Sequence, residues 1–199
     1  MFKGFLNGFF RTEKLIEQMG SPVNKVALQA IEILQARKCF QDGTLHGADL
    51  RKANLVKAKL AKADLQGVNL QGANLANAYL PLVNLRAANL QYANLRDAVL
   101  REAMLVAVDL SEADLRGVHL AATRLEEANL SGANLENANL WHVRLQGANL
   151  RGANLSGVNL DGALFDEDTI LPNGERWSAG VDLARFTDSS HADFWRAEK

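Results

Sequence analysis

The chain has 199 residues, 48% of them hydrophobic, which suits one domain with small flanking segments. Its formal net charge is −1, so the composition does not predict an extended basic surface for nucleic acid. The single cysteine, Cys39, excludes an intramolecular disulfide and a four-cysteine zinc site, and no apolar run reaches the ~18 residues of a transmembrane helix.

Residues 1–42 are predicted to form a helical segment that caps one end of the fold. Within the first ten residues, Phe2, Phe5, Leu6 and Phe9 have helical spacing, which gives one apolar face. We expect an amphipathic segment that covers apolar surface. A signal peptide and a membrane-surface helix are the alternatives, and the short apolar part, broken by glycines, favours neither.

Two short helices are predicted to follow, over 12–19 and from 22 to about 38. Gly20 ends the first helix. Ser21 followed by Pro22 has the pattern of an N-cap residue with proline at the first helical position. The second helix has one apolar face, and Cys39 and Phe40 are expected to pack behind it as part of the cap.

Between residues 45 and 160, leucine stands at every fifth position, 24 times in succession. Two positions before each leucine stands a small residue, which is Ala in 16 units and Val in 6. One position before, Asn or Asp stands in 16 of the 24 units. A period of five fits neither a helix nor a strand. It suits a chain that turns a corner every five residues, with the leucine and the small residue inside and the other three positions facing solvent.

The eight units without Asn or Asp indicate how many units make one turn of the chain. In its place they hold Thr44, Lys59, Tyr79, Val99, Met104, His119, Arg124 and Arg144. They form two series with a spacing of 20 residues, or four units. The first runs from Lys59 to His119, and the second runs from Met104 to Arg144, with Thr44 in the same column. Four units per coil therefore put all of them on two adjacent sides and leave an unbroken column of Asn or Asp on each of the other two. The 24 units then make about six coils, a rod about 29 Å long at about 4.8 Å per coil.

The iterated unit, as in Ala73-Asn74-Leu75 and Ala153-Asn154-Leu155, resembles the pentapeptide-repeat family over about Gly43 to Phe165. The resemblance implies an all-β solenoid: a right-handed quadrilateral β-helix with four units per coil and leucine at the central inward position. The four-unit spacing of the exceptions agrees with it independently. We therefore predict a β-helix of about six coils over 43–167, with an α-helical N-terminal cap.

Residues 168–199 are predicted to form a C-terminal cap made of a hairpin and short helices. Asn173-Gly174 is a strong signal for a hairpin turn. Short helices are expected over 181–186 and 192–197. The segment 165–174 resembles the endings of bacterial pentapeptide-repeat proteins, cyanobacterial ones especially.

The motifs of enzymes are missing from this pattern. The glycines occupy single turn positions and make no phosphate-binding loop, and no nucleophile elbow is present. His119 and His142 lie on the same side one coil apart, but their offset and the lack of a nearby cysteine favour solvated surface roles over a metal site. We predict no catalytic residues, no cofactor and no metal ligands.

Outward apolar residues on the two irregular sides form a candidate interaction patch. Its members are Tyr79, Leu82, Val99, Met104, Val106 and Trp141, with Pro81, Ala107, Ala121 and Ala122 beside them. Apolar patches of several hundred Å² are rarely left bare on monomers. The chain's own Phe-rich N-terminus or Trp-rich C-terminus, a second copy in a homodimer, or a different protein could cover it. Tyr79 and Trp141 are the expected anchors, because aromatic residues dominate interface hot spots.

These features favour a non-enzymatic solenoid scaffold or protein–protein interaction module, bacterial and cytoplasmic, whose protein partner the sequence does not name. The alternative comes from the resemblance, since some pentapeptide-repeat proteins mimic DNA and regulate a topoisomerase, gyrase. Mimicry needs a strongly acidic rod, whereas residues 44–167 hold 12 Lys or Arg and 13 Asp or Glu. Direct binding of nucleic acid is not expected.

Overall fold

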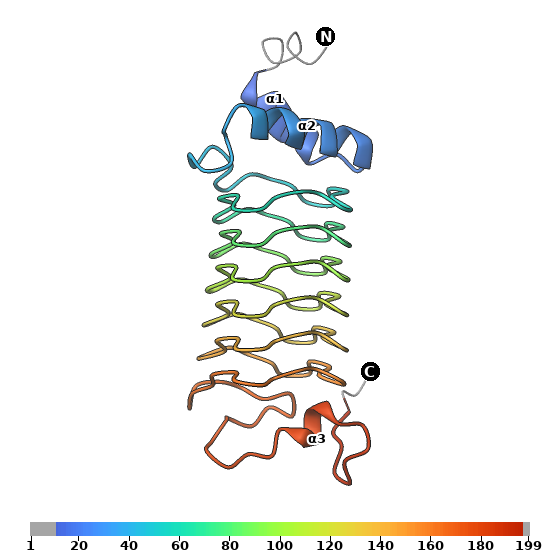
Figure 1. Cartoon of the computed structure of the whole chain (residues 1–199), viewed down its shortest axis with the longest axis vertical. Helices are drawn as coiled ribbons and strands as arrows, with labels where there is room; N and C mark the ends of the chain where they lie inside the picture. The colour runs from blue at the N-terminus through green and yellow to red at the C-terminus, as the bar shows by residue number, and fades with distance from the viewer. Residues whose placement is uncertain (1–10, 197–199) are drawn as a thin grey trace.

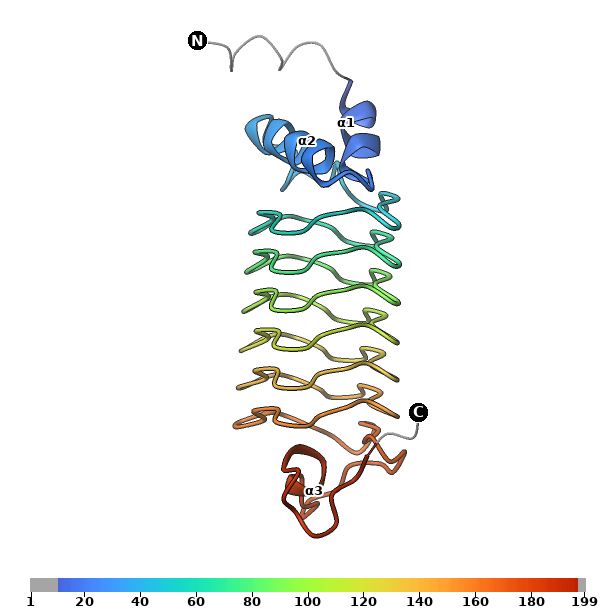
Figure 2. The same cartoon turned by 90° about the vertical axis from the view of Figure 1, so that its right-hand side faces the viewer.

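The computed structural model describes residues 11–196, which form a straight rod of stacked coils (Figure 1). Helices α1 (Thr12–Met19) and α2 (Asn24–Ala36) cover one end, and the short α3 (Ala184–Thr187) lies in the segment at the other end. A view turned by 90° shows the same stack, so the rod is regular on all sides (Figure 2). No helix within 11–196 is long and apolar enough to span a membrane. The predicted apolar face within 1–10 lies outside the described residues.

Successive coils pair through parallel bridges, each of which joins a residue to its equivalent four units later, with one bridge on each of four sides. The bridged residues are those just before the leucines, and they run from Asp49 to Asn149 on side 1, Asn54 to Asn154 on side 2, Lys59 to Asn159 on side 3 and Asp64 to Leu164 on side 4. We number the coils from coil 1 (48–67) to coil 6 (148–167). Four units per coil, as the sequence predicts, is therefore the observed arrangement.

The interior of the rod is a ladder of leucines and small residues. Leu95, in the middle of the rod, is 1% exposed and Ala93 is fully buried. Each buried leucine contributes roughly 2 kcal/mol of transfer free energy, so the ladder supplies the main stabilisation of the rod. At the one coil position where threonine replaces the small residue, the Thr123 hydroxyl donates a hydrogen bond of 2.8 Å to the Leu100 carbonyl.

The corners of the coils all have the same backbone. Every fifth position from 47 to 162 has a left-handed conformation, with φ between 52° and 73°, and most of these positions hold a residue other than glycine. The Asn or Asp before the leucine stabilises the corner: the Asn94 Oδ1 accepts a hydrogen bond of 3.1 Å from the Arg96 N–H. It also bonds between coils, as when Asn154 Nδ2 donates to Asn134 Oδ1 at 3.1 Å. The column of Asn and Asp residues thus stabilises the turns of the fold by hydrogen bonds.

The N-terminal helices satisfy the open edge of coil 1. The Asn54 N–H donates to the Ser21 carbonyl at 2.9 Å, and Asn24 Nδ2 donates to the Asn54 carbonyl at 3.0 Å. Ser21 and Pro22 do not start the helix as predicted. The Ser21 Oγ accepts from the Val23 N–H at 3.1 Å, and α2 begins at Asn24. The reason is that this turn faces coil 1, where the Ser21 carbonyl accepts the Asn54 N–H. Helix α2 also ends at Ala36, two residues before the predicted end.

The C-terminal segment contains the predicted hairpin, with an antiparallel bridge between Ile170 and Arg176 around Gly174. Helix α3 overlaps the first predicted helix. The second, over 192–197, is wrong for its described part, because 192–196 is not helical. There the backbone docks on the preceding segment: the Trp195 N–H donates to the Arg185 carbonyl at 2.8 Å, and its ring meets Phe186 edge-on with centroids 6.1 Å apart.

Candidate interaction surface

The predicted patch residues lie at outward positions on sides 3 and 4. Tyr79 and Leu82 are on side 3 of coil 2, and their exposed fractions are 48% and 44%. Trp141 is on side 3 of coil 5 and is 48% exposed. The remaining three residues, Val99, Met104 and Val106, are half-buried in coil 3. The exposed apolar area is therefore concentrated in coils 2 and 5.

The distribution of exposed side chains singles out these two sides. Within 11–196, the exposed large hydrophobic residues are Val23, Tyr79, Leu82, Tyr92, Trp141 and Leu164. Four of the six lie on sides 3 and 4, Tyr92 lies at a corner of side 1, and Val23 lies in the N-terminal cap. Leu164 is 47% exposed but was not among the predicted patch residues. Its signal was its place in the column of Met104, where the four-unit register puts it outside.

Some of the patch residues are neighbours in successive coils, and others are separated by charged residues. Tyr79 pairs directly with Val99 in the next coil, and Val99 pairs with His119. The charged corner residues Arg101 and Glu102 stand between Val99 and the half-buried Met104 of side 4. The patch is therefore two groups on adjacent sides, and side 3 carries the exposed aromatic residues of both coils.

Of the possible covers for the patch, the C-terminal residues up to 196 are not one, because their aromatic side chains lie elsewhere. Trp177 stacks on Phe165 with centroids 5.9 Å apart, at the end of the rod. Phe194 and Trp195 border outward residues of sides 1 and 2, among them Ser131 and Glu136. Tyr79 and Trp141 remain open on side 3.

Ion pairs stabilise three sides of the rod and leave one without. Arg51 pairs with Asp49 on side 1, and Arg116 pairs with Asp114 on side 2. On side 4, Glu126 pairs with Arg124 and Arg144, and His46 pairs with Asp64. Among the described residues, the charged side chains of side 3 form no ion pair: Lys59, Lys62, Arg101, Glu102 and Asp161. Their counter-charges are therefore not supplied by the rod itself.

Charge is otherwise distributed evenly around the rod. Over coils 1–6, each side carries three Lys or Arg; sides 1 and 2 carry three Asp or Glu, side 3 carries two and side 4 carries five. The largest excess on any side is therefore two negative charges, a weak field compared with the evenly repeated phosphates of a nucleic acid.

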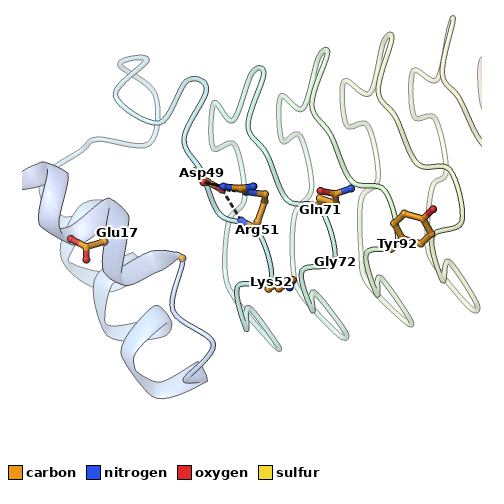
Figure 3. Close-up of a pocket in the computed structure, with 8 residues that line it drawn as sticks. Glu17, Asp49, Arg51, Lys52, Gln71, Gly72 and Tyr92 are labelled. Atoms are coloured by element: carbon orange, nitrogen blue, oxygen red, sulfur yellow. Dashed lines mark hydrogen bonds and ion pairs between the residues drawn. The ribbon is translucent and has the colours of Figure 1, made fainter.

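A shallow groove lies between α1 and side 1 (Figure 3). Its lining residues are Glu17, Gly20, Asp49, Arg51, Lys52, Gln71, Gly72 and Tyr92. Arg51 donates two hydrogen bonds to the Asp49 carboxylate, Nε to Oδ1 at 2.9 Å and Nη2 to Oδ2 at 2.6 Å, and lowers the pKa of Asp49 to about 2. A carboxylate that stays ionised in this way is a poor proton donor or acceptor near neutral pH. The groove therefore offers a paired charge and little acid–base chemistry.

The remaining candidate groups are dispersed. His142 packs edge-on against Trp141, with ring centroids 4.0 Å apart. The residues from 11 to 196 contain no group of three or more His, Cys, Asp or Glu side chains placed to hold a metal ion. Burial raises the pKa of the Cys39 thiol, which disfavours the reactive thiolate.

A rod whose interior is filled by leucine and whose variable residues all lie outside defines a β-helical solenoid. The family model for pentapeptide repeats matches this chain in eight copies, over residues 44–80, 78–117 and 128–166. The chain belongs to the pentapeptide-repeat family. The predicted fold, a right-handed quadrilateral β-helix, is thereby confirmed.

Solved structures of the family resemble the rod to different degrees. HetL from the cyanobacterium Nostoc sp. strain PCC 7120, a protein involved in heterocyst differentiation regulation, is 36% identical with a TM-score of 0.60. That match covers 66% of this chain but 62% of HetL, less than two thirds of its length. Rfr23 from the cyanobacterium Cyanothece 51142 is 33% identical, covers 57% of this chain and 90% of its own, and has a TM-score of 0.36. A search of curated proteins found no match.

Proposed function

We propose that this protein is a non-enzymatic interaction module that binds a protein partner through side 3, with the apolar residues of side 4 at the margin. The observation that carries the proposal is that side 3 holds Tyr79, Leu82 and Trp141, three of the six exposed large hydrophobic residues within 11–196. Aromatic residues supply much of the energy of protein interfaces, and exposed ones gain free energy when a partner removes them from water.

Two further features support a binding role. The charged residues of side 3 have no counter-ion within the described chain, so a partner can supply one without breaking an existing pair. HetL, with 36% identity, is involved in the regulation of differentiation, a role that a binding protein can perform. The cytoplasmic location remains a prediction from the sequence.

DNA mimicry remains the second hypothesis, but the charges do not support it. A protein that imitates DNA must present a continuous acidic face, as the phosphates of a duplex do. Here the most acidic side has five Asp or Glu against three Lys or Arg, and side 3 has more basic than acidic residues. The interaction surface is better described as apolar in coils 2 and 5, with charged residues in coils 1, 3 and 6.

The double change Tyr79→Ser with Trp141→Ser tests the proposal. Both side chains are about half exposed, so the leucine core should stay intact and the circular dichroism spectrum should not change. We expect the variant to lose the protein partners, and any self-association, that the wild-type chain shows in affinity capture. Tyr92→Ser is the matched control, because Tyr92 is 63% exposed but lies at a corner of side 1. Equal capture by the wild type and the double variant would refute the proposal.

A further inference from the structure

We infer that side 3 binds side 3 of a second copy of this chain, with the two rods antiparallel. This inference rests on the proposed function, since it names the partner of the same surface. It is carried by the order in which side 3 presents its residues along the rod: basic residues in coil 1, apolar residues in coils 2 and 5, one basic and one acidic residue in coil 3, and an acidic residue in coil 6.

Two-fold symmetry fixes which residues meet. A two-fold axis in the interface, perpendicular to the rods between coils 3 and 4, places coil 1 against coil 6, coil 2 against coil 5 and coil 3 against coil 4. Each outward residue then faces the residue that holds the same place in the opposite coil. Because the interface is isologous, every such contact occurs twice.

The aromatic anchors meet apolar partners in this register. Trp141 faces Pro81 of the second copy, with Tyr79 and Leu82 on either side of that proline. Leu82 faces His142, whose ring already packs edge-on against Trp141. Four exposed side chains of coils 2 and 5 are thus removed from water in each half of the interface. A proline ring against an indole ring also adds contact area at little cost in side-chain entropy.

The charges complement each other at both ends of the interface. Lys59 and Lys62 of coil 1 flank Ala61, and Ala61 faces Asp161 in coil 6 of the second copy. None of these three charged side chains has an ion pair within the described residues. A parallel arrangement would instead place the lysines of the two copies together and leave Asp161 beside its own equivalent. Like charges in juxtaposition oppose association, so the charge pattern selects the antiparallel arrangement.

The sizes of the facing residues also match. Lys62 faces Gly162, Asp161 faces Ala61, Arg101 faces Ala121, and Glu102 faces Ala122. In each of these pairs a charged side chain meets a residue with little or no side chain. This alternation lets two flat sides approach closely, as shape complementarity at interfaces requires.

An interface made of one side of a rod about 29 Å long belongs to the small size class, which is typical of weak and reversible complexes. The dimer should therefore appear as a concentration-dependent species. Sedimentation velocity on the full chain, from low micromolar to near-millimolar protein, is the appropriate measurement.

Charge exchange tests the arrangement. The variant Lys59→Glu with Lys62→Glu puts acidic residues against Asp161 at both ends of its homodimer, and Asp161→Lys puts lysine against lysine at both ends. We expect each variant alone to dimerise about tenfold more weakly than the wild type, since two weak ion pairs become repulsive. A one-to-one mixture of the two variants should regain wild-type association as a heterodimer, because both ends are again complementary. Lys52→Glu, also in coil 1 but at the corner of sides 1 and 2, is the matched control and should have no effect.

The outcomes separate the inference from the proposed function. A chain that stays monomeric throughout the concentration range refutes the dimer. If such a monomer still captures another protein through Tyr79 and Trp141, the proposed function stands and only the inference fails. A dimer that charge reversal weakens but the mixture does not rescue uses another geometry and also refutes the antiparallel arrangement. Circular dichroism of each variant confirms that these surface changes leave the coils folded.

Discussion

Sides 1 and 2 differ from sides 3 and 4 in one position of the five-residue unit, although all four share the same core and the same corners. On sides 1 and 2 the residue before each leucine of coils 1–6 is Asn or Asp, and at every one of these positions except Asn54 the side chain accepts the N–H of the residue two places on. On sides 3 and 4 that residue varies. At Tyr79 the capping oxygen is missing, and the residue two places on is Pro81, which has no N–H to donate. Asn84, Asn139 and Asn159 keep this cap on sides 3 and 4, whereas the units there without Asn or Asp carry other side chains at that position.

Substitution of a core leucine should cost the same stability on sides 1 and 2 as on sides 3 and 4. Leu95 on side 2 and Leu100 on side 3 are each 1% exposed. We expect Leu95→Ala and Leu100→Ala each to lower the free energy of unfolding by about 2–5 kcal/mol, through lost burial and the cavity that remains. Urea-induced unfolding followed by circular dichroism measures both. A clearly smaller cost on side 3 would show that its leucines are less important to the rod.

The polar column should distinguish the sides. Asn134 on side 2 accepts hydrogen bonds from the Glu136 N–H and from Asn154 Nδ2, each at 3.1 Å. We expect Asn134→Ala to cost about 1 kcal/mol of unfolding free energy, measured by thermal or urea unfolding. His119→Ala, at the equivalent place on side 3, is the control and should change stability by less than about 0.5 kcal/mol. Equal losses would mean that capping is not what separates the sides.

Substitutions at the corners should affect stability in the same way on any side. Whether they raise or lower stability depends on the left-handed backbone conformation at that position. Ala107 on side 4 has φ 55°, where a Cβ is unfavourable, so Ala107→Gly should change stability little or raise it by up to about 1 kcal/mol. Gly72 on side 1 has φ 66°, and an added Cβ would meet only the Lys52 Cγ, at 3.7 Å, in ordinary contact. We expect Gly72→Ala to cost about 1 kcal/mol from backbone strain alone. A stabilising Gly72→Ala, by differential scanning calorimetry, would contradict this explanation.

The smallest expected effect concerns the exposed ion pair of side 1. Hydrogen bonds from Arg51 lower the pKa of Asp49 to about 2. The depressed pKa means that the pair's contribution to stability is complete above the ordinary carboxyl pKa and is lost as the pH falls towards 2. The side chains are exposed, so the effect on stability is small and the titration itself is the better measurement. By NMR, Arg51→Gln should return the Asp49 midpoint towards its ordinary value, and an unchanged midpoint would refute the assignment.

The sequence predicts the rod well because each unit obeys a local rule that repeats 24 times, so the register follows from the columns of Asn and Leu. Segments outside the repeat are harder to predict, because their structure depends on contacts that the five-residue pattern does not describe. Helix α2 starts two residues late because Ser21 and Pro22 form the turn that contacts coil 1. Residues near Trp195 are not helical because they dock on the Arg185 carbonyl.

The candidate surface follows the same distinction. The register correctly placed Tyr79 and Trp141 outside, since the outward positions are fixed by the period of five. It did not predict that Val99 would be only half exposed or that the C-terminal aromatic residues would turn to sides 1 and 2. Both depend on the packing of neighbouring side chains, about which a five-residue pattern contains no information.

The four-unit coil also determines how this protein can change by insertion and deletion. One extra unit would keep every leucine inside and every corner intact, yet it would rotate all later residues by one side. Trp141 would then move from side 3 to side 4 and no longer share a face with Tyr79. An insertion of four units, one complete coil, would preserve the face and only lengthen it. Stability thus tolerates length changes in steps of one unit, whereas the identity of a binding face is conserved only in steps of a whole coil.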